Sequence, residues 1–155
     1  MKILFVCLGN ICRSPTAEGV LKYLLASEAP QLKVEIDSAG TGNYHAGAAP
    51  DPRSQRAAMR RGIDLSGLRA RQVVPADFAR FDRILAMDND NLRALQAQKP
   101  KTSKAELRLF LDYAEHAGSR EVPDPYGGDR DDFEHVLDLI TLASRGLIAD
   151  LKKSP

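Results

Sequence analysis

The chain begins with a short apolar run that leads directly into a turn and then into a helical pattern. Ile3-Leu4-Phe5-Val6 is followed by Cys-Leu-Gly-Asn-Ile-Cys-Arg-Ser-Pro at residues 7–15. A short apolar run that ends at a glycine-containing turn is typical of a buried parallel strand. We expect Ser14 to cap the next helix and Pro15 to occupy its first position, where a missing N–H costs nothing. A strand, loop and helix in succession are the repeating unit of α/β proteins.

The same alternation continues along the chain and predicts the overall fold. We expect an α/β protein with a three-layer, doubly wound sheet of four parallel strands in the order 2-1-3-4, right-handed crossovers and about five helices on both faces. Residues 1–155 match the usual size of one domain and contain no linker or repeat, so a single domain is predicted. The predicted strands cover residues 3–6, 34–36, 83–87 and 107–110. Helices are predicted over residues 52–61 and 75–80 and from the cap Asp88 to about Gln98. A long last helix is predicted from apolar positions between Phe133 and Leu151.

Residues 7–13 place a thiol and a guanidinium on one anion-binding loop. Five residues separate Cys7 from Arg13, which lets the chain curl once around a tetrahedral oxyanion while Gly9 permits the tight turn. The backbone N–H groups and the helix N-terminus add positive potential, so we expect Cys7 to be a thiolate at neutral pH. A lone cysteine after a strand is often only a small core residue, but this context favours a phosphate site. Its predicted residues are Leu8, Gly9, Asn10, Ile11, Cys12, Arg13 and Ser14.

A second candidate lies far downstream, in the segment Val122-Pro-Asp-Pro-Tyr-Gly-Gly128. Phosphoryl transfer from a phenol needs a proton for the leaving oxygen, and Asp124 on a proline-stiffened loop can supply one. Taken alone, this segment is an ordinary turn. Because ligands of doubly wound sheets bind at the carboxyl ends of the strands, where the loop at Cys7 lies, we interpret Asp124 as a catalytic partner of that loop.

Together, Val-Cys-x-Gly-Asn-x-Cys-Arg-Ser-Pro and the downstream Asp-Pro-Tyr resemble the low-molecular-weight protein tyrosine phosphatase family over nearly the whole chain. The resemblance implies a metal-independent hydrolase without a cofactor, in which Cys7 forms a cysteinyl-phosphate, Arg13 binds the phosphate and Asp124 serves as general acid and base. It also implies that Ser14 aids the thiolate and that Asn10 braces the loop. Tyr44 and Tyr126 are expected to flank the substrate entrance.

Two positions depart from the family pattern. Many relatives have a second aromatic residue where this chain has Gly127, so one aromatic wall of the entrance is expected to be missing. Relatives often carry a histidine at the position of Leu68, hydrogen-bonded to the bracing residues. We therefore expect the brace in this chain to be completed by other groups or to be weaker.

Cys12 offers a redox hypothesis. It shares the loop with Cys7, and a thiol that close could trap a sulfenic acid at Cys7 as a reversible disulfide before irreversible oxidation. The alternative is that Cys12 is a small residue packed under the helix.

Three other functions compete with tyrosine phosphatase activity. Thiol-coupled arsenate reductases of this fold need further downstream cysteines, and none follows Cys12. Protein-arginine phosphatases of the family typically carry threonine where Ile11 stands, so the aliphatic residue favours a phenolic substrate. A non-catalytic phosphate-binding module would not need both Cys7 and Asp124.

Composition and charge limit the partners and the location. A net charge of +1 gives no reason to expect nucleic-acid binding, and no apolar stretch is long enough for a signal peptide or membrane insertion, so we expect a cytoplasmic protein. The expected partner is a tyrosine-phosphorylated protein; relatives suggest a bacterial tyrosine kinase, and a host protein fits equally. No oligomeric state is predicted. The three histidines lack metal-ligand spacing, and the arginines at residues 53, 56, 60 and 61 form either a solvated face or a docking surface for acidic phosphotyrosine segments.

Overall fold

A computed structural model describes residues 1–153 and contains one four-stranded parallel sheet. The strands are β1 (Lys2–Cys7), β2 (Glu35–Gly40), β3 (Arg83–Ala86) and β4 (Glu106–Leu109), in the order β2-β1-β3-β4. All three pairings are parallel. The predicted α/β class and the order 2-1-3-4 are therefore confirmed.

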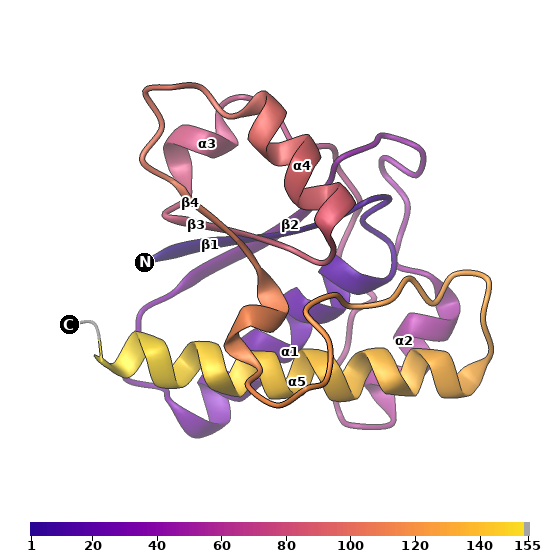
Figure 1. The fold of residues 1–155 in the computed structure, drawn as a ribbon. Coiled ribbons are helices and arrows are strands. Elements are labelled where there is room, and N and C mark those ends of the chain that lie inside the picture. The colour runs from indigo at the N-terminus through magenta and orange to yellow at the C-terminus, as the bar shows by residue number, and fades with distance from the viewer. Residues whose placement is uncertain (154–155) are drawn as a thin grey trace.

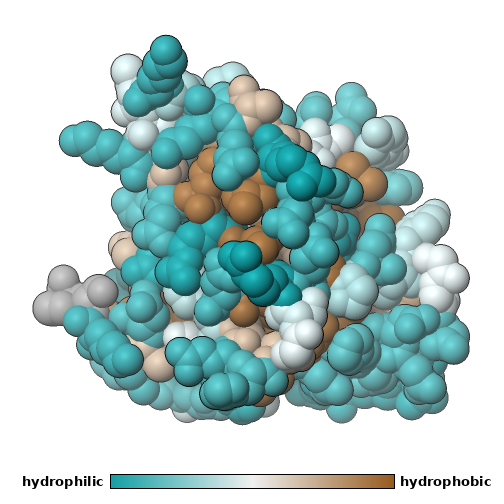
Figure 2. Space-filling model, viewed as in Figure 1, coloured by the Kyte–Doolittle hydropathy of each residue, from teal (hydrophilic) through white to brown (hydrophobic). Residues whose placement is uncertain are grey.

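Helices cover both faces of the sheet, as predicted (Figure 1). The helices α1 (Arg13–Glu28), α2 (Pro52–Met59) and α5 (Arg130–Lys153) lie on one face, and α3 (Asp77–Arg80) and α4 (Asn89–Gln98) lie on the other. Side chains of β1 alternate between the two cores: Ile3 and Phe5 point to the α1 and α5 layer, while Leu4 and Val6 point to the α3 and α4 layer. The same view coloured by hydropathy shows polar residues over both layers and apolar residues gathered between them, where the sheet lies (Figure 2).

The long last helix, α5, connects the elements on its face of the sheet. Its predicted apolar positions from Phe133 to Leu151 are buried, and the helix packs on α1, α2 and the 3-10 helix Phe110–Tyr113. Asp131 and Asp132 lie in its first turn, where carboxylates favour the positive end of the helix. In the part of the chain that the structure describes, no helix combines the length and the apolar character that crossing a membrane requires.

Some element boundaries differ from those predicted. The second strand begins at Glu35 and runs to Gly40 because it pairs with the whole of β1, from Lys2↔Glu35 to Cys7↔Gly40. The helix expected over 52–61 ends at Met59, and the strand expected over 107–110 ends at Leu109, where the 3-10 helix begins. The cap at Asp88 is confirmed, since its side chain accepts the N–H of Asn91.

The prediction for the start of α1 was wrong. Cys12, not Ser14, stands at the N-cap, no side chain caps the helix, and Pro15 is its third residue. Pro15 still costs nothing there because the first N–H groups of a helix have no partner within the helix. The Ser14 hydroxyl is directed instead at Cys7 and Asn10, 3.0 Å and 2.7 Å away. Polar contacts within the loop after β1 thus replace the expected cap.

Candidate active site

The loop between β1 and α1 surrounds the sulfur of Cys7. Cys7 ends β1 and is 2% exposed. Its Sγ accepts the backbone N–H of Asn10 at 3.3 Å and lies 3.0 Å from the Ser14 hydroxyl. Asn10 adopts a left-handed conformation, with φ of 57°, which folds the loop back over the sulfur. The loop therefore directs hydrogen-bond donors toward Cys7, as a binding site for a negative charge requires.

The predicted site residues meet at one pocket of about 380 Å³. Three loops form this pocket together: the β1–α1 loop, the loop after β2 and the loop before α5. Its lining residues are Cys7, Leu8, Gly9, Ile11, Cys12, Arg13, Tyr44, His45, Asp124 and Tyr126. Asn10 and Ser14 were also predicted for this site, but they do not line the pocket. Their side chains contact each other on the side of the loop away from the pocket.

Arg13 is buried and held in place by two acceptors. Its Nη1 donates to Asp88 Oδ2 at 2.7 Å and to the carbonyl oxygen of Val122 at 3.0 Å. Burial alone would lower the pKa of Arg13, but the negative charges of Cys7, Asp88 and Asp124 outweigh burial and raise it. The guanidinium is therefore a fixed positive charge beside the sulfur.

Asp124 extends over the same pocket from the opposite side. Its Oδ2 lies 3.8 Å from Arg13 Nη2, its Oδ1 accepts the N–H of Tyr126, and its side chain is 49% exposed. The loop that carries it is anchored at both ends: the N–H of Val122 donates to the Met87 carbonyl, and Arg53 donates to the Tyr126 carbonyl. A carboxyl group with access to solvent thus stands within reach of a group bound at Arg13.

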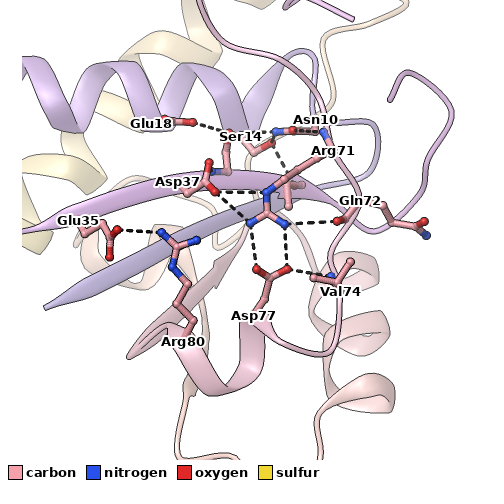
Figure 3. A network of polar contacts seen from close by, with 12 residues as sticks. Asn10, Ser14, Glu18, Glu35, Asp37, Arg71, Gln72, Val74, Asp77 and Arg80 are labelled. Carbon is pink, nitrogen blue, oxygen red and sulfur yellow. Dashed lines mark hydrogen bonds and ion pairs between the residues drawn. The ribbon is translucent and has the colours of Figure 1, made fainter. Parts of the chain in front are cut away.

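A buried network lies behind the loop (Figure 3). The Asn10 side-chain amide donates to the hydroxyls of Ser14, at 2.7 Å, and Ser38, at 3.1 Å. The Ser38 hydroxyl donates to Glu18 Oε1 at 2.7 Å, and Asn10 Oδ1 accepts the N–H of Arg71. These contacts complete the brace without the histidine that Leu68 replaces.

The chemistry of these groups sets the direction of the hydrogen bonds. A Glu18 carboxylate can only accept, so it takes the proton of Ser38, which must then accept from Asn10. Ser14 also accepts from Asn10. Its own proton has two acceptors within reach, Cys7 Sγ at 3.0 Å and the Ala39 carbonyl oxygen at 3.4 Å, and the sulfur is the closer of the two. The network therefore presents a donor to the sulfur.

Arg71 fixes the backbone that contacts Asn10. Its guanidinium donates to both carboxylate oxygens of Asp77, each at 3.0 Å, and to Asp37 Oδ2 at 3.0 Å. These contacts tie the segment before α3 to β2 (Figure 3). The N–H of Arg71 is thereby held where the Asn10 side chain needs it.

Cys12 lies in the same pocket as Cys7, and both cysteines are free. Burial raises the pKa of the Cys12 thiol to about 12, although a hydrogen bond with Ser54 acts in the opposite direction. Cys12 is therefore a neutral thiol at physiological pH.

Comparison with known proteins agrees with this geometry over nearly the whole chain. Residues 2–155 match the family described as low molecular weight phosphotyrosine protein phosphatase. The chain belongs to the low molecular weight phosphotyrosine protein phosphatase family. The chain is similar to the low molecular weight protein-tyrosine-phosphatase YfkJ of Bacillus subtilis, with 39% identity, covering 99% of this chain and 97% of the relative.

Solved structures of low molecular weight phosphatases share the fold. A crystal structure of the protein tyrosine phosphatase from Entamoeba histolytica, with Hepes in its active site, gives a TM-score of 0.94 at 41% identity and covers 99% of this chain and 97% of that one. The structure of a Drosophila arginine phosphatase gives 0.92 at 30% identity and covers both chains fully. The fold alone therefore does not distinguish a phosphotyrosine substrate from a phosphoarginine substrate.

The roles of two residues at the site of this low molecular weight phosphatase were missed from sequence: His45 lines the pocket, and Asp88 holds Arg13. His45 was considered only as a metal ligand, yet its ring lies 6.3 Å from that of Tyr126. Asp88 was assigned only as a helix cap. Both had a signal: His45 follows the predicted entrance residue Tyr44, and Asp88 comes two residues after the end of β3, at the edge where the pocket forms.

Proposed function

We propose that this chain hydrolyses phosphotyrosine in proteins through a cysteinyl-phosphate, with Cys7 as nucleophile, Arg13 as phosphate ligand and Asp124 as general acid and base. One observation carries the proposal: Cys7 Sγ receives two hydrogen-bond contacts at the base of a pocket that also contains Arg13 and Asp124. An anionic sulfur, a fixed cation and a solvent-accessible carboxyl group are the parts that metal-free phosphoryl transfer needs.

In the first step, Cys7 Sγ attacks phosphorus, the S–P bond forms and the P–O bond to tyrosine breaks. Arg13 Nη1 is occupied by Asp88 and Val122, so Nη2 and Nε are left for the phosphate oxygens. Asp124 gives its proton to the departing phenolic oxygen. In the second step, water attacks phosphorus, its proton goes to Asp124, and the S–P bond breaks to return the thiolate and release phosphate.

The walls of the pocket support an aromatic substrate. Tyr44 and Tyr126 are 72% and 53% exposed and flank the opening, while Ile11 contributes an aliphatic surface beside the sulfur. A tyrosine ring that enters between them would bury apolar surface. Phosphotyrosine is therefore preferred over phosphoarginine in this proposal.

Variants of the two proposed catalytic groups test the mechanism. Cys7→Ser should abolish turnover of p-nitrophenyl phosphate and of phosphotyrosine peptides, and Asp124→Asn should lose most activity with poor leaving groups, which depart only when protonated. Unchanged turnover in Cys7→Ser would exclude the covalent route. Equal losses of Asp124→Asn across leaving groups would exclude general acid catalysis, and faster hydrolysis of phosphoarginine than of phosphotyrosine would refute the substrate class.

The proposed chemistry needs no metal or cofactor, because the Arg13 guanidinium and the backbone N–H groups supply the positive charge. Activity should therefore survive exhaustive treatment with EDTA. Loss of activity that a divalent cation restores would contradict this part of the proposal.

We further infer that the enzyme works in the cytoplasm on a tyrosine-phosphorylated protein, with a bacterial tyrosine kinase as the first partner to examine. Both cysteines are free, and the cytoplasm keeps thiols reduced. The Cys7→Ser variant keeps the binding surface and should retain the phosphorylated kinase in a pull-down with purified proteins. Equal retention of the unphosphorylated kinase would argue against this partner.

A further inference from the structure

The arginine-rich face of α2 borders a hollow that the proposed catalytic steps do not use. The hollow has a volume of about 420 Å³ and lies between α2 and the start of α5, which pack side by side (Figure 1). We call it the arginine hollow. Its lining residues are Arg53, Arg56, Arg60, Asp129, Arg130 and Phe133.

Part of this positive charge is neutralised within the chain. Arg53 pairs with Asp51, and Arg60 pairs with Glu134, at 3.0 Å and 2.9 Å. Arg61, on the same stretch, turns to Glu134 and Asp138. These three arginines therefore do not form a docking surface of unpaired charges for acidic phosphotyrosine segments.

Arg56 and Arg130 differ from the others. Within residues 1–153, neither side chain forms an ion pair or a hydrogen bond, and both are exposed. The one acidic residue of the hollow, Asp129, accepts the N–H of Asp132 at the start of α5. Arg56 and Arg130 therefore carry positive charges that no ion pair within residues 1–153 neutralises, and both line the hollow. An anion placed between them would pair with both.

The hollow adjoins the active site through Arg53. The Arg53 guanidinium lies 5.5 Å from the ring centre of Tyr126, a wall of the active-site pocket, and 4.7 Å from that of Phe133, which lines the hollow. The two ring centres are thus within about 10 Å, a span that roughly three extended residues cover. A peptide whose phosphotyrosine occupies the pocket can therefore reach the hollow with a nearby side chain.

We propose that the arginine hollow binds an aspartate or glutamate side chain of the protein substrate, a few residues from its phosphotyrosine. This inference rests on the proposed function and adds an acidic flank to the substrate class. A carboxylate fits because a guanidinium can hold its two oxygens with parallel N–H groups. Arg56 and Arg130 would determine specificity, since neither touches the reacting atoms.

Matched phosphopeptides test the inference. One phosphotyrosine peptide carries alanine on both sides, a second carries glutamates at the two to four positions before the phosphotyrosine, and a third carries them after it. These peptides are compared on the wild type, on the double variant Arg56→Gln/Arg130→Gln, and on Lys101→Gln/Lys104→Gln. The lysine variant loses the same charge from exposed positions in the turn before β4.

We expect one acidic peptide to exceed the alanine peptide in kcat/KM by about threefold to tenfold on the wild type, because exposed ion pairs are individually weak. The preference should vanish in the arginine variant and at high salt, and persist in the lysine variant. Turnover of p-nitrophenyl phosphate should be equal in all three proteins. Equal kcat/KM for all peptides on the wild type would overturn the inference, as would a preference that the arginine variant retains or that the lysine variant loses equally.

A binding measurement separates this inference from the proposed function. Dissociation constants of the three peptides for the Cys7→Ser variant, with and without the two arginine substitutions, do not depend on catalysis. Tighter binding of an acidic peptide that requires Arg56 and Arg130 supports the arginine hollow even if the catalytic proposal fails. Equal dissociation constants refute it even if the alanine peptide is hydrolysed.

Discussion

Replacement of Asp88 with asparagine is expected to loosen the Arg13 guanidinium without removing the cap of α4. Asp88 Oδ2 accepts from Arg13 Nη1 at 2.7 Å, while Oδ1 accepts the N–H of Asn91 at the start of the helix. Asparagine is as good an N-cap as aspartate. The substitution therefore leaves an oxygen for the helix and replaces the carboxylate oxygen that faces Arg13 with an NH2 group, which cannot accept from the guanidinium.

The size of the effect follows from burial. The Arg13 side chain is 4% exposed and Asp88 is 21% exposed, so water replaces the lost contact poorly. A hydrogen bond to a charged group contributes about 1.5–3 kcal/mol, and this contact is lost outright because the asparagine NH2 and the guanidinium are both donors. We expect a loss of about 1.5–3 kcal/mol in the orientation of Arg13, which corresponds to a decrease of roughly tenfold to 150-fold in kcat/KM.

The assay is steady-state hydrolysis of p-nitrophenyl phosphate, with urea unfolding to verify that the variant is folded. Asp112→Asn is the matched control, because Asp112 is 23% exposed and also pairs with an arginine, but that partner, Arg120, is 72% exposed. The control should keep the wild-type kcat/KM. A decrease of less than twofold in Asp88→Asn, or an equal decrease in Asp112→Asn, would refute the reasoning.

Two further predictions concern the phosphate loop. Peroxide should convert Cys7 to a sulfenic acid that Cys12 traps as a disulfide, visible by mass spectrometry and reversed by dithiothreitol; absence of the crosslink, or equal recovery of a Cys12→Ser variant, would count against the trap. Gly40→Ala would place a Cβ 2.6 Å from the carbonyl oxygen of Leu8, so we expect overpacking of about 1–3 kcal/mol and a lower kcat. Gly67→Ala meets nothing within 4 Å and should behave as the wild type; equal kcat values for the two variants would contradict this account.

Local patterns predicted the fold well because they are strong in this chain. The apolar run of β1, the Asp88 cap and the periodic residues of α5 each report on contacts that their own segment must make. Strand order followed from the rules for doubly wound sheets. The Ser14 hydroxyl was misassigned because a helix cap competes with contacts to Cys7 and Asn10, and propensity alone does not show which contact is formed.

Parts of the site depend on contacts between distant segments. Arg13 and Asp88 are 75 residues apart, and Arg53 and Tyr126 are 73 apart. A carboxylate after a strand or an arginine on a helix gives no sign of which partner the fold will bring to it. Sequence could therefore predict which residue types carry the chemistry, but not how Asp88 and Arg53 hold them.

The carboxylate of Glu18 influences the loop around Cys7 even though it lies outside the pocket. An acceptor-only group at that end takes the Ser38 proton, which leaves the Ser38 oxygen to accept from the Asn10 amide. Glutamine at residue 18 could instead donate to the Ser38 oxygen, which would then face two donors while its own proton needs another acceptor. In that arrangement the hydrogen bond between Asn10 and Ser38 would be weaker, and the loop around Cys7 would lose part of its rear support, although residue 18 does not line the pocket.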